Sequence, residues 1–226
     1  MLTRNLFKRL STQFYISIAV ILGSLGFTPI QSALAQTQST IELSQDSTSS
    51  SPRAIIEKFH FALLDTMKNA QPLGISGRYK KLTPAVATAY DLTCWIRLSS
   101  GRFWRKATDN QKQQLKTAFK EMSAATYASQ FKSYNGESFK TIGERPGPQN
   151  SILVQTEIVR KKKKPVGLTY IVFKSGDQWR IVDILLDNKI SQLAVRRSEY
   201  RSLLKRDGID GLIAKLKQIT NKILGG

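Results

Sequence analysis

The chain has 226 residues, of which 41% are hydrophobic, enough to build a domain with a substantial core. Lysine and arginine outnumber aspartate and glutamate by 35 to 16, and the formal net charge of +19 makes anionic surfaces the expected partners. A single cysteine excludes an internal disulfide, and a single histidine excludes a metal site built from several histidines.

The first residues have the pattern of an export signal. Arg4, Lys8 and Arg9 precede an apolar run at residues 14–27 that is too short and too weakly flanked for a membrane-spanning helix. Residues 33–35, Ala-Leu-Ala, have the A-x-A form of a signal-peptidase site. No cysteine lies near this site, so a lipid anchor is not expected. We therefore expect a cleaved signal peptide and a periplasmic product.

Cleavage would divide the chain into three parts. Residues 1–35 are the predicted signal peptide, residues 36–51 a polar tether predicted to be disordered, and residues 52–226 a single domain. The leader holds few of the basic residues, so the mature chain stays strongly basic. Outside the cytoplasm such a surface would meet anionic phospholipid headgroups or acidic proteins rather than nucleic acid. A basic surface that serves solubility alone is the alternative.

Apolar residues at helical spacing predict four helices in the first half of the domain, at 52–68, 78–90, 92–98 and 108–133. Ser51-Pro52 has the residue types of an N-cap followed by a first helical position. Asp91 is expected to cap the third helix, and Thr108 forms a capping box with Gln111 at the start of the fourth. Pro84 is expected to interrupt the second helix.

From residue 138 to residue 186, the apolar residues no longer follow helical spacing but alternate with polar ones. Alternating apolar residues predict four strands, at 138–142, 151–160, 166–174 and 178–186. Short turn-like segments join these strands, so neighbours should be antiparallel and form a meander. Two further helices close the chain, one at about 192–206 and one after Asp207-Gly208. Helices, then a sheet, then helices again indicate an α+β fold.

Charged residues in the last strand and in the helix after it require a structural or a chemical role. Asp183 lies in a strand with apolar residues on both faces, where an isolated carboxylate is costly. At ~100° per residue, Arg197 falls on the apolar stripe of the following helix, near Leu193 and Tyr200. We therefore predict a buried ion pair between Asp183 and Arg197, with Arg196 as the second choice. The alternative is a small α+β enzyme that uses Asp183 as a base on an apolar substrate.

No familiar catalytic pattern supports that alternative. The sequence contains no G-x-S-x-G, P-loop, dinucleotide-binding or H-E-x-x-H motif. His60, the single histidine, lies beside the apolar stripe of the first helix and is expected to pack there rather than to act in catalysis. The sequence therefore predicts no catalytic residue, no metal and no cofactor.

Basic residues are concentrated at one hairpin of the predicted sheet. Arg160, Lys161, Lys162, Lys163 and Lys164 are consecutive. Such a run can be a solvated turn that discourages edge-to-edge pairing. It can also contact an anionic membrane or an acidic partner, at ~1 kcal/mol per basic residue near an anionic leaflet. The run alone does not decide between these two interpretations.

Several short motifs, taken in order, resemble one known family. They are Tyr90-Asp91, Gly101-Arg-Phe-Trp-Arg105, Thr126-Tyr127-Ala128, Tyr134-Asn-Gly136, Tyr170, Trp179-Arg-Ile-Val-Asp183, Ile190-Ser191 and Asp207-Gly208. Together they resemble the periplasmic lipid-binding component of Mla-type ABC transport systems, also called the toluene-tolerance auxiliary family. The resemblance covers residues 52–224, and residues 190–200 resemble the hopanoid-associated branch in particular.

This resemblance implies a soluble carrier that shuttles a phospholipid or a hopanoid between inner- and outer-membrane complexes. The implied partner is the inner-membrane Mla-type ABC transporter, and the acyl chains would sit in an apolar pocket between the sheet and the helices. The side chains expected in the pocket wall are Phe103, Trp104, Tyr127, Ile152, Val154, Leu168, Tyr170 and Val172. Each is equally compatible with ordinary core packing. A cationic adaptor that encloses no ligand is a third alternative.

Overall fold

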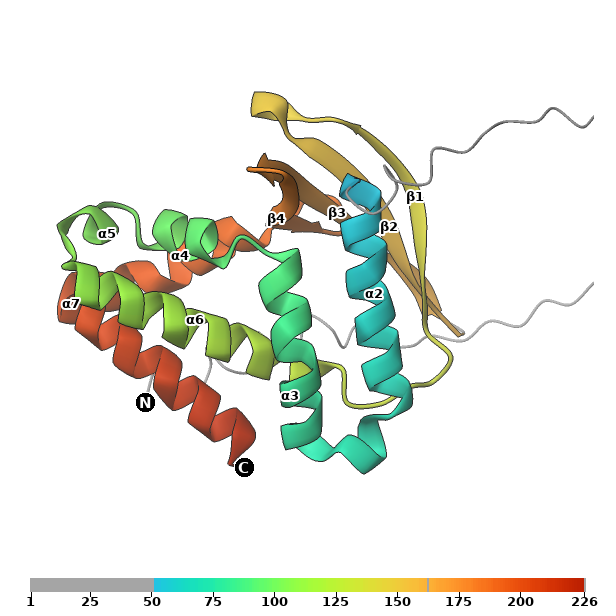
Figure 1. Cartoon of the computed structure of the whole chain (residues 1–226), viewed down its shortest axis with the longest axis horizontal. Helices are drawn as coiled ribbons and strands as arrows, with labels where there is room; N and C mark the ends of the chain where they lie inside the picture. The colour runs from blue at the N-terminus through green and yellow to red at the C-terminus, as the bar shows by residue number, and fades with distance from the viewer. Residues whose placement is uncertain (1–50, 162, 226) are drawn as a thin grey trace, which may run out of the picture. The chain divides into compact units, whose positions relative to one another are not determined.

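A computed structural model describes residues 51–161 and 163–225, which form helices and one antiparallel sheet (Figure 1). The predicted α+β class is confirmed. The predicted signal peptide and, apart from Ser51, the predicted tether lie outside the described residues. No helix in the described ranges is both long and apolar enough to cross a bilayer.

The first described helix, α2 (Pro52–Lys68), has the bounds that the sequence predicts. Ser51 caps it, because its Oγ accepts a hydrogen bond of 3.0 Å from a backbone N–H in the first turn. The apolar stripe of α2 is buried, with Ile56, Phe59 and Leu63 at most 2% exposed. This helix lies against the sheet in Figure 1, so its stripe covers part of the sheet's apolar face.

The second helix, α3 (Ala70–Ala89), begins earlier than predicted and continues through Pro84. The interruption falls instead at Gly74, whose backbone (φ 57°, ψ −172°) is non-helical and suits glycine. Leu82 and Val86, on either side of the proline, are almost completely buried. Their packing holds the helix together where the missing donor of a proline would otherwise break it. The predicted interruption at Pro84 is therefore wrong.

Three helices follow: α4 (Leu92–Ser100), α5 (Arg102–Lys106) and α6 (Asp109–Gln130). Asp91 caps α4 by accepting a hydrogen bond of 2.8 Å from the Cys94 backbone N–H. Thr108 and Gln111 make both hydrogen bonds of a capping box at the start of α6. These two caps confirm the predicted starts of α4 and α6.

The sheet has five strands in chain order, every neighbouring pair antiparallel: β1 (Ser138–Pro146), β2 (Ile152–Arg160), β3 (Lys163–Ser175), β4 (Gln178–Leu186) and β5 (Ile190–Ser191). The short helix η2 (Pro148–Asn150) joins β1 to β2. The predicted four-stranded meander is therefore present, and β1 and β3 are longer than predicted. The two-residue β5 is the one addition.

One face of this sheet is apolar across three strands. In the register, Val154 pairs with Tyr170, which pairs in turn with Ile184 on β4. The neighbouring row joins Thr156, Leu168 and Leu186 in the same way. Side chains on this inner face alternate with residues on the other face that are mostly half-buried or exposed, although Leu153 and Thr169 on that other face are also buried. The inner face belongs to the same core cluster as the buried stripes of the helices.

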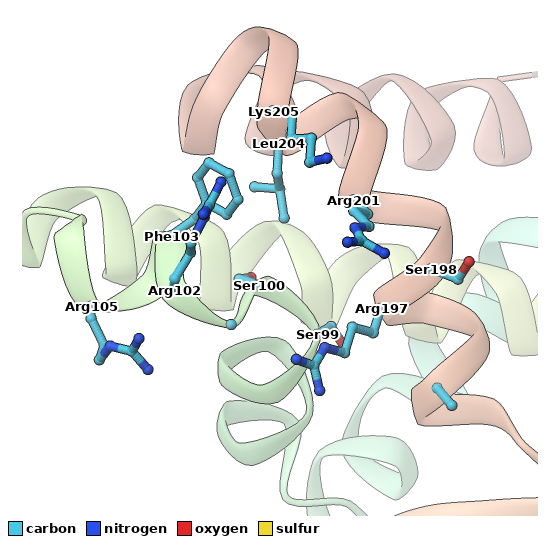
Figure 2. Close-up of a pocket in the computed structure, with 12 residues that line it drawn as sticks. Ser99, Ser100, Arg102, Phe103, Arg105, Arg197, Ser198, Arg201, Leu204 and Lys205 are labelled. Atoms are coloured by element: carbon cyan, nitrogen blue, oxygen red, sulfur yellow. The ribbon is translucent and has the colours of Figure 1, made fainter.

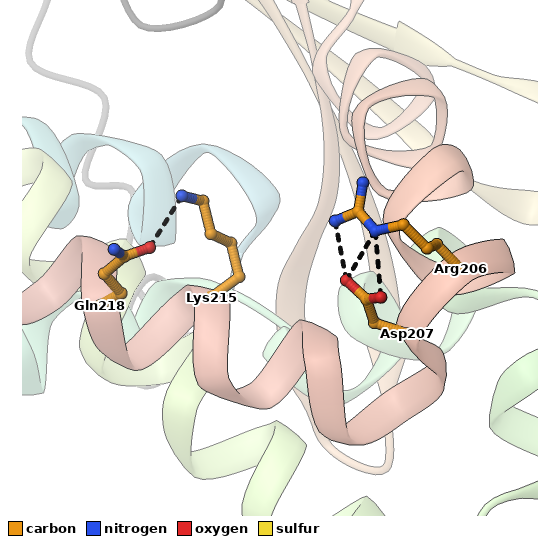
Figure 3. Close-up of polar contacts among 4 residues, drawn as sticks. All are labelled: Arg206, Asp207, Lys215 and Gln218. Atoms are coloured by element: carbon orange, nitrogen blue, oxygen red, sulfur yellow. Dashed lines mark hydrogen bonds and ion pairs between the residues drawn. The ribbon is translucent and has the colours of Figure 1, made fainter. Parts of the chain in front are cut away.

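The last helix, α7 (Gln192–Leu224), consists of two helical segments that meet at Gly208 (φ 65°, ψ −159°). This confirms the predicted break after Asp207. Arg206 donates to both carboxylate oxygens of Asp207 at the break, and Lys215 donates to Gln218 at 2.8 Å in the second segment (Figure 3). The second segment lies beside α6 in Figure 1, and Leu212 and Leu216 on it are fully buried.

Replacing Gly208 with alanine is expected to lower the free energy of unfolding by about 1–3 kcal/mol, because its φ and ψ lie in a region that is open essentially to glycine alone. Gly143→Ala is the control, since an added Cβ there meets nothing within 4 Å and its φ is not in the left-handed region. Urea denaturation of both variants measures the difference. Equal stability of the two variants would contradict a strained bend at Gly208.

Candidate functional site

The interior between the sheet and the helices contains most of the side chains predicted for a pocket wall. Val154 and Val172 are fully buried, Tyr170 is 2% exposed and Leu168 is 8% exposed, all on the inner face of the sheet. Ile152 and Tyr127 are half-buried and pack against the same core. These six residues therefore come together between β2, β3 and α6. Phe103 and Trp104, on α5, are half-buried against the same cluster.

Aromatic rings connect the helices at this interior. The ring of Phe59 on α2 lies 5.4 Å from that of Tyr90 and 5.2 Å from that of Tyr127, edge-on to both. The hydroxyl groups of Tyr90 and Tyr127 are hydrogen-bonded to each other. Burial raises the pKa of Tyr127 to about 12 and the pKa of Tyr90 well above its usual value of 10, so both phenols stay protonated.

His60 joins α2 to the sheet. Its Nε2 lies 2.8 Å from the hydroxyl oxygen of Tyr170, and its ring stacks on Phe139 with centroids 4.0 Å apart. Burial disfavours the imidazolium form and lowers the pKa of His60 to about 3, an effect that Glu57 opposes only in part. The histidine is therefore a packing residue, as the sequence predicts, and burial keeps it neutral.

Acidification is expected to destabilise the protein more steeply than its His60→Gln variant. An unfolded histidine binds a proton below about pH 6.5, whereas folded His60 stays neutral down to about pH 3. The unfolded state thus binds more protons in this window. The stability that neutral His60 contributes is complete above pH 6.5 and is lost as the pH falls toward 3, at up to ~1.4 kcal/mol per pH unit. Urea denaturation at several pH values measures this, and equal pH dependence of the two proteins would contradict it.

Asp183 is buried, but its partners are not arginines. Its Oδ1 accepts hydrogen bonds from the backbone N–H groups of Leu193, at 2.9 Å, and Ile184, at 2.7 Å, and its Oδ2 accepts one from the Ser191 hydroxyl. Ser191 also caps α7 by accepting from the Ala194 N–H at 3.0 Å. Asp183 therefore anchors the N-terminus of α7 to β4, where free backbone donors and the helix dipole favour a carboxylate.

The predicted ion pair between Asp183 and Arg197 is wrong. Arg197 is exposed, and Asp183 forms no ion pair with any of the described residues. Arg196, the second choice, pairs instead with Glu199 at 3.2 Å. The prediction failed because helical spacing places Arg197 on the apolar stripe of α7 but does not show which element packs against it. An exposed guanidinium needs no buried carboxylate, and neutral donors satisfy Asp183.

Arg196 lies close to the interior on the other side of α7. Its charge lowers the pKa of both Tyr127 and Tyr200, although burial keeps each raised to about 12. The hydroxyl of Tyr200 is buried and has no hydrogen-bond partner among the described residues. A buried polar atom without a partner is uncommon and costs about 1–3 kcal/mol. The donor of this hydroxyl is therefore not used by the described residues.

A basic pocket of about 660 Å³ lies between α4–α5 and the first half of α7. Its cationic side chains come from two elements: Arg102 and Arg105 from α5, and Arg197, Arg201 and Lys205 from α7 (Figure 2). Phe103 and Leu204 add apolar surface. This pocket was not predicted from the sequence, although three of its cations recur every four residues and so share one helix face.

Comparison with known proteins identifies the family to which this chain belongs. The family model described as MlaC protein matches residues 57–218, most of the chain. The chain belongs to the MlaC family. A solved structure of similar fold is a phospholipid-binding protein from Ralstonia solanacearum in complex with a phospholipid. Its TM-score is 0.65 and its sequence identity 21%, over 75% of this chain and 97% of that chain.

Membership in the MlaC family confirms the resemblance at the level of the family. The match runs from α2 to the second segment of α7, so it includes the interior, the Asp183 anchor and the α7 wall of the basic pocket. The hopanoid-associated branch stays a prediction, because the family model does not distinguish branches.

The basic hairpin of this MlaC family member lies where β2 turns into β3. Lys161, Lys163 and Lys164 are exposed, and Lys162 lies outside the described residues. Arg160 is half-buried, and its Nη2 donates to the Lys164 backbone oxygen at 2.8 Å across the turn. The exposed lysines can therefore reach an external surface, while Arg160 stabilises the turn itself.

Proposed function

We propose that this MlaC family protein is a periplasmic lipid carrier. Its residues bind the apolar part of a phospholipid or a hopanoid between the sheet and the helices, and they perform no chemistry on it. The Ralstonia protein, which has the same fold, holds a phospholipid, and this supports a lipid as the ligand here. Both oxygens of Asp183 accept hydrogen bonds that hold α7 in place, which favours a structural role over that of a catalytic base.

Besides the fold, one observation on a single side chain supports a bound lipid. The buried Tyr200 hydroxyl has no partner among the described residues, and it belongs to the core cluster that includes the inner face of the sheet. Phospholipids carry ester and phosphate oxygens at the junction of head and tail, and hopanoids can carry hydroxyl groups. Either oxygen type would satisfy Tyr200 while the apolar portion lies among the neighbouring side chains.

Apolar burial supplies the energy for binding. The inner-face side chains pack against the helices, so a lipid tail enters only where the two layers separate. Ile152, Tyr127 and Phe139 are half-buried and mark places where that packing is incomplete. Each buried methylene contributes ~0.8 kcal/mol, so a long acyl chain offsets the loss of several side-chain contacts.

The place of this carrier in transport follows from the same proposal. The leader at residues 1–35 would direct the chain to the periplasm, and the domain at 52–226 would receive lipid from, or deliver it to, an inner-membrane Mla-type ABC transporter. Residues 190–200, which resemble the hopanoid-associated branch, make a hopanoid the specific alternative to a glycerophospholipid.

Lipid uptake from vesicles tests the proposal. The mature chain is incubated with phospholipid vesicles, separated by gel filtration and assayed for bound lipid. Tyr200→Phe is expected to keep or raise stability, since it removes an unpartnered buried hydroxyl, and to retain less lipid than the wild type. Tyr134→Phe, at a side chain that is 41% exposed, is the matched control and should retain wild-type levels. A wild-type protein that takes up no phospholipid or hopanoid would refute the carrier function.

The basic hairpin is expected to bring the carrier to anionic membranes. Replacing Lys161, Lys162, Lys163 and Lys164 with glutamine should weaken binding to phosphatidylglycerol-containing vesicles, by ~1 kcal/mol per lysine at low salt and by less at high salt. Vesicle co-sedimentation measures this. A control variant loses the same charge from exposed lysines on the helices, Lys58, Lys80, Lys120 and Lys217. If both variants bind equally, the hairpin has no special role at the membrane.

A further inference from the structure

The basic pocket, defined by Arg102, Arg105, Arg197, Arg201 and Lys205, concentrates positive charge on two facing walls. No carboxylate contributes to its lining. Within residues 51–161 and 163–225, none of the five cations forms an ion pair with a carboxylate. Among the described residues, therefore, neither the pocket lining nor an ion pair offsets the positive charge of these five exposed side chains.

The spacing of the cations on α7 adds a modest repulsion, about 0.2–0.5 kcal/mol per neighbouring pair, between side chains that are exposed to solvent. Arg197, Arg201 and Lys205 follow one another every four residues on α7, a spacing at which like charges repel. Arginine does not lose its charge by deprotonation, so the repulsion cannot be relieved that way. A phosphate between the two walls would relieve it, since guanidinium groups offer paired donors that match phosphate oxygens.

The remaining residues that line the pocket indicate which kind of anion would bind there. The hydroxyls of Ser99 and Ser100 donate to backbone oxygens of α4, at 2.7 Å and 2.6 Å, so the arginines and the lysine are the strong donors left for an anion. Phe103 and Leu204 give the pocket an apolar side, and Leu204 also belongs to the core cluster of the interior. A volume of about 660 Å³ exceeds the needs of a lone phosphate and is typical of ligand pockets.

We propose that the basic pocket binds the phosphate of an anionic phospholipid headgroup. The proposal rests on the carrier function and names its substrate class: lipids whose headgroup keeps a net negative charge, such as phosphatidylglycerol. An anionic phospholipid shares its phosphate group with free phosphate and with small phosphate esters. The apolar side of the pocket favours a phosphate that is attached to a lipid. A zwitterionic headgroup would lose most of the benefit, because its own cation would face the arginines.

Binding of soluble short-chain lipids tests this inference directly. Dihexanoyl phosphatidylglycerol is titrated into the mature protein below its critical micelle concentration, in parallel with dihexanoyl phosphatidylcholine, sn-glycerol 3-phosphate and inorganic phosphate. We expect the wild type to bind the phosphatidylglycerol at least tenfold more tightly than the phosphatidylcholine or either tail-less phosphate. Equal affinity for the two lipids would overturn the proposal. Inorganic phosphate or glycerol phosphate binding as tightly as the anionic lipid would show a free-phosphate site and would also overturn it.

Variants that remove the same charge from different positions test whether the preference for anionic lipid comes from the basic pocket. Arg197→Gln with Arg201→Gln should reduce affinity for the anionic lipid at least tenfold and leave affinity for phosphatidylcholine within twofold. Arg145→Gln with Lys174→Gln removes the same charge from exposed positions on β1 and β3 and should leave both affinities unchanged. If both double variants lost the same affinity for the anionic lipid, the preference would come from net charge alone, and the basic pocket would not be a headgroup site.

The outcome also separates this inference from the carrier function. If the Arg197→Gln, Arg201→Gln protein still takes up phosphatidylcholine from vesicles and the wild type shows no preference for anionic lipid, the basic pocket is not a headgroup site but the carrier stands. If the wild type takes up no lipid from any vesicle, the carrier function fails first. Thermal unfolding of the variant checks that it is folded in either case.

Discussion

Asp183→Ala is expected to lower the free energy of unfolding by about 3–5 kcal/mol, one of the two largest effects that we predict. The variant removes a buried carboxylate, 7% exposed, that accepts hydrogen bonds from Ser191, Leu193 and Ile184. Each donor left without a partner costs about 1–3 kcal/mol, less where water can replace the carboxylate. The N-terminus of α7 would also lose its charged anchor on β4. Urea denaturation followed by tryptophan fluorescence measures the loss.

Two companion variants separate this account from the ion pair that the sequence predicts. Asp183→Asn keeps the shape and one acceptor oxygen, so it should cost less than the alanine variant. Arg197→Gln should change stability by less than about 0.5 kcal/mol, because Arg197 is exposed and lines the basic pocket. A cost for Arg197→Gln as large as that for Asp183→Ala would restore the buried ion pair and contradict the hydrogen bonds described here.

Tyr170→Ala is expected to cost about 3–5 kcal/mol, the range for truncating a buried aromatic side chain. Tyr170 is 2% exposed on the inner face of β3, between Val154 and Ile184, and its hydroxyl contacts His60. Tyr170→Phe removes only that hydroxyl and should cost about 1 kcal/mol. The same urea denaturation compares both variants with the wild type.

The pair of tyrosine variants distinguishes core packing from an open pocket wall. A residue that only borders an open cavity could be truncated at little cost, whereas the packing seen here predicts a large loss. A cost below about 1 kcal/mol for Tyr170→Ala, together with increased lipid uptake, would contradict this packing and would make Tyr170 part of an open pocket.

Local chemistry explains why much of the fold follows from the sequence. The start of α2 is set by Ser51 and the proline after it, and the start of α6 by the capping box of Thr108 and Gln111. Alternation along β2 and the short turns between strands predict the antiparallel meander and its buried face. Gly208 marks the break in α7 because few residues adopt its backbone angles. Each of these features depends on residues close together in the chain.

Features that depend on tertiary contacts were predicted less well. Pro84 lies within α3 because buried neighbours hold the helix together, which no local rule reveals. The spacing of Arg197 places it on the apolar side of α7 but does not show that its side chain lies in a pocket with α4 and α5 rather than against β4. The basic pocket requires two elements far apart in the sequence, so only its α7 half, Arg197, Arg201 and Lys205, was visible as a repeat of four.

The most direct test of the central claim, that the interior carries lipid, is to identify what co-purifies with the protein. The mature chain is isolated from the periplasm without detergent, extracted with organic solvent and analysed by mass spectrometry. We expect about one glycerophospholipid or hopanoid per protein molecule, less of it in Tyr200→Phe, and an enrichment of anionic headgroups if the basic pocket binds them. A folded wild-type protein that is repeatedly free of lipid, and that stays free after incubation with vesicles, would show that the interior does not carry lipid.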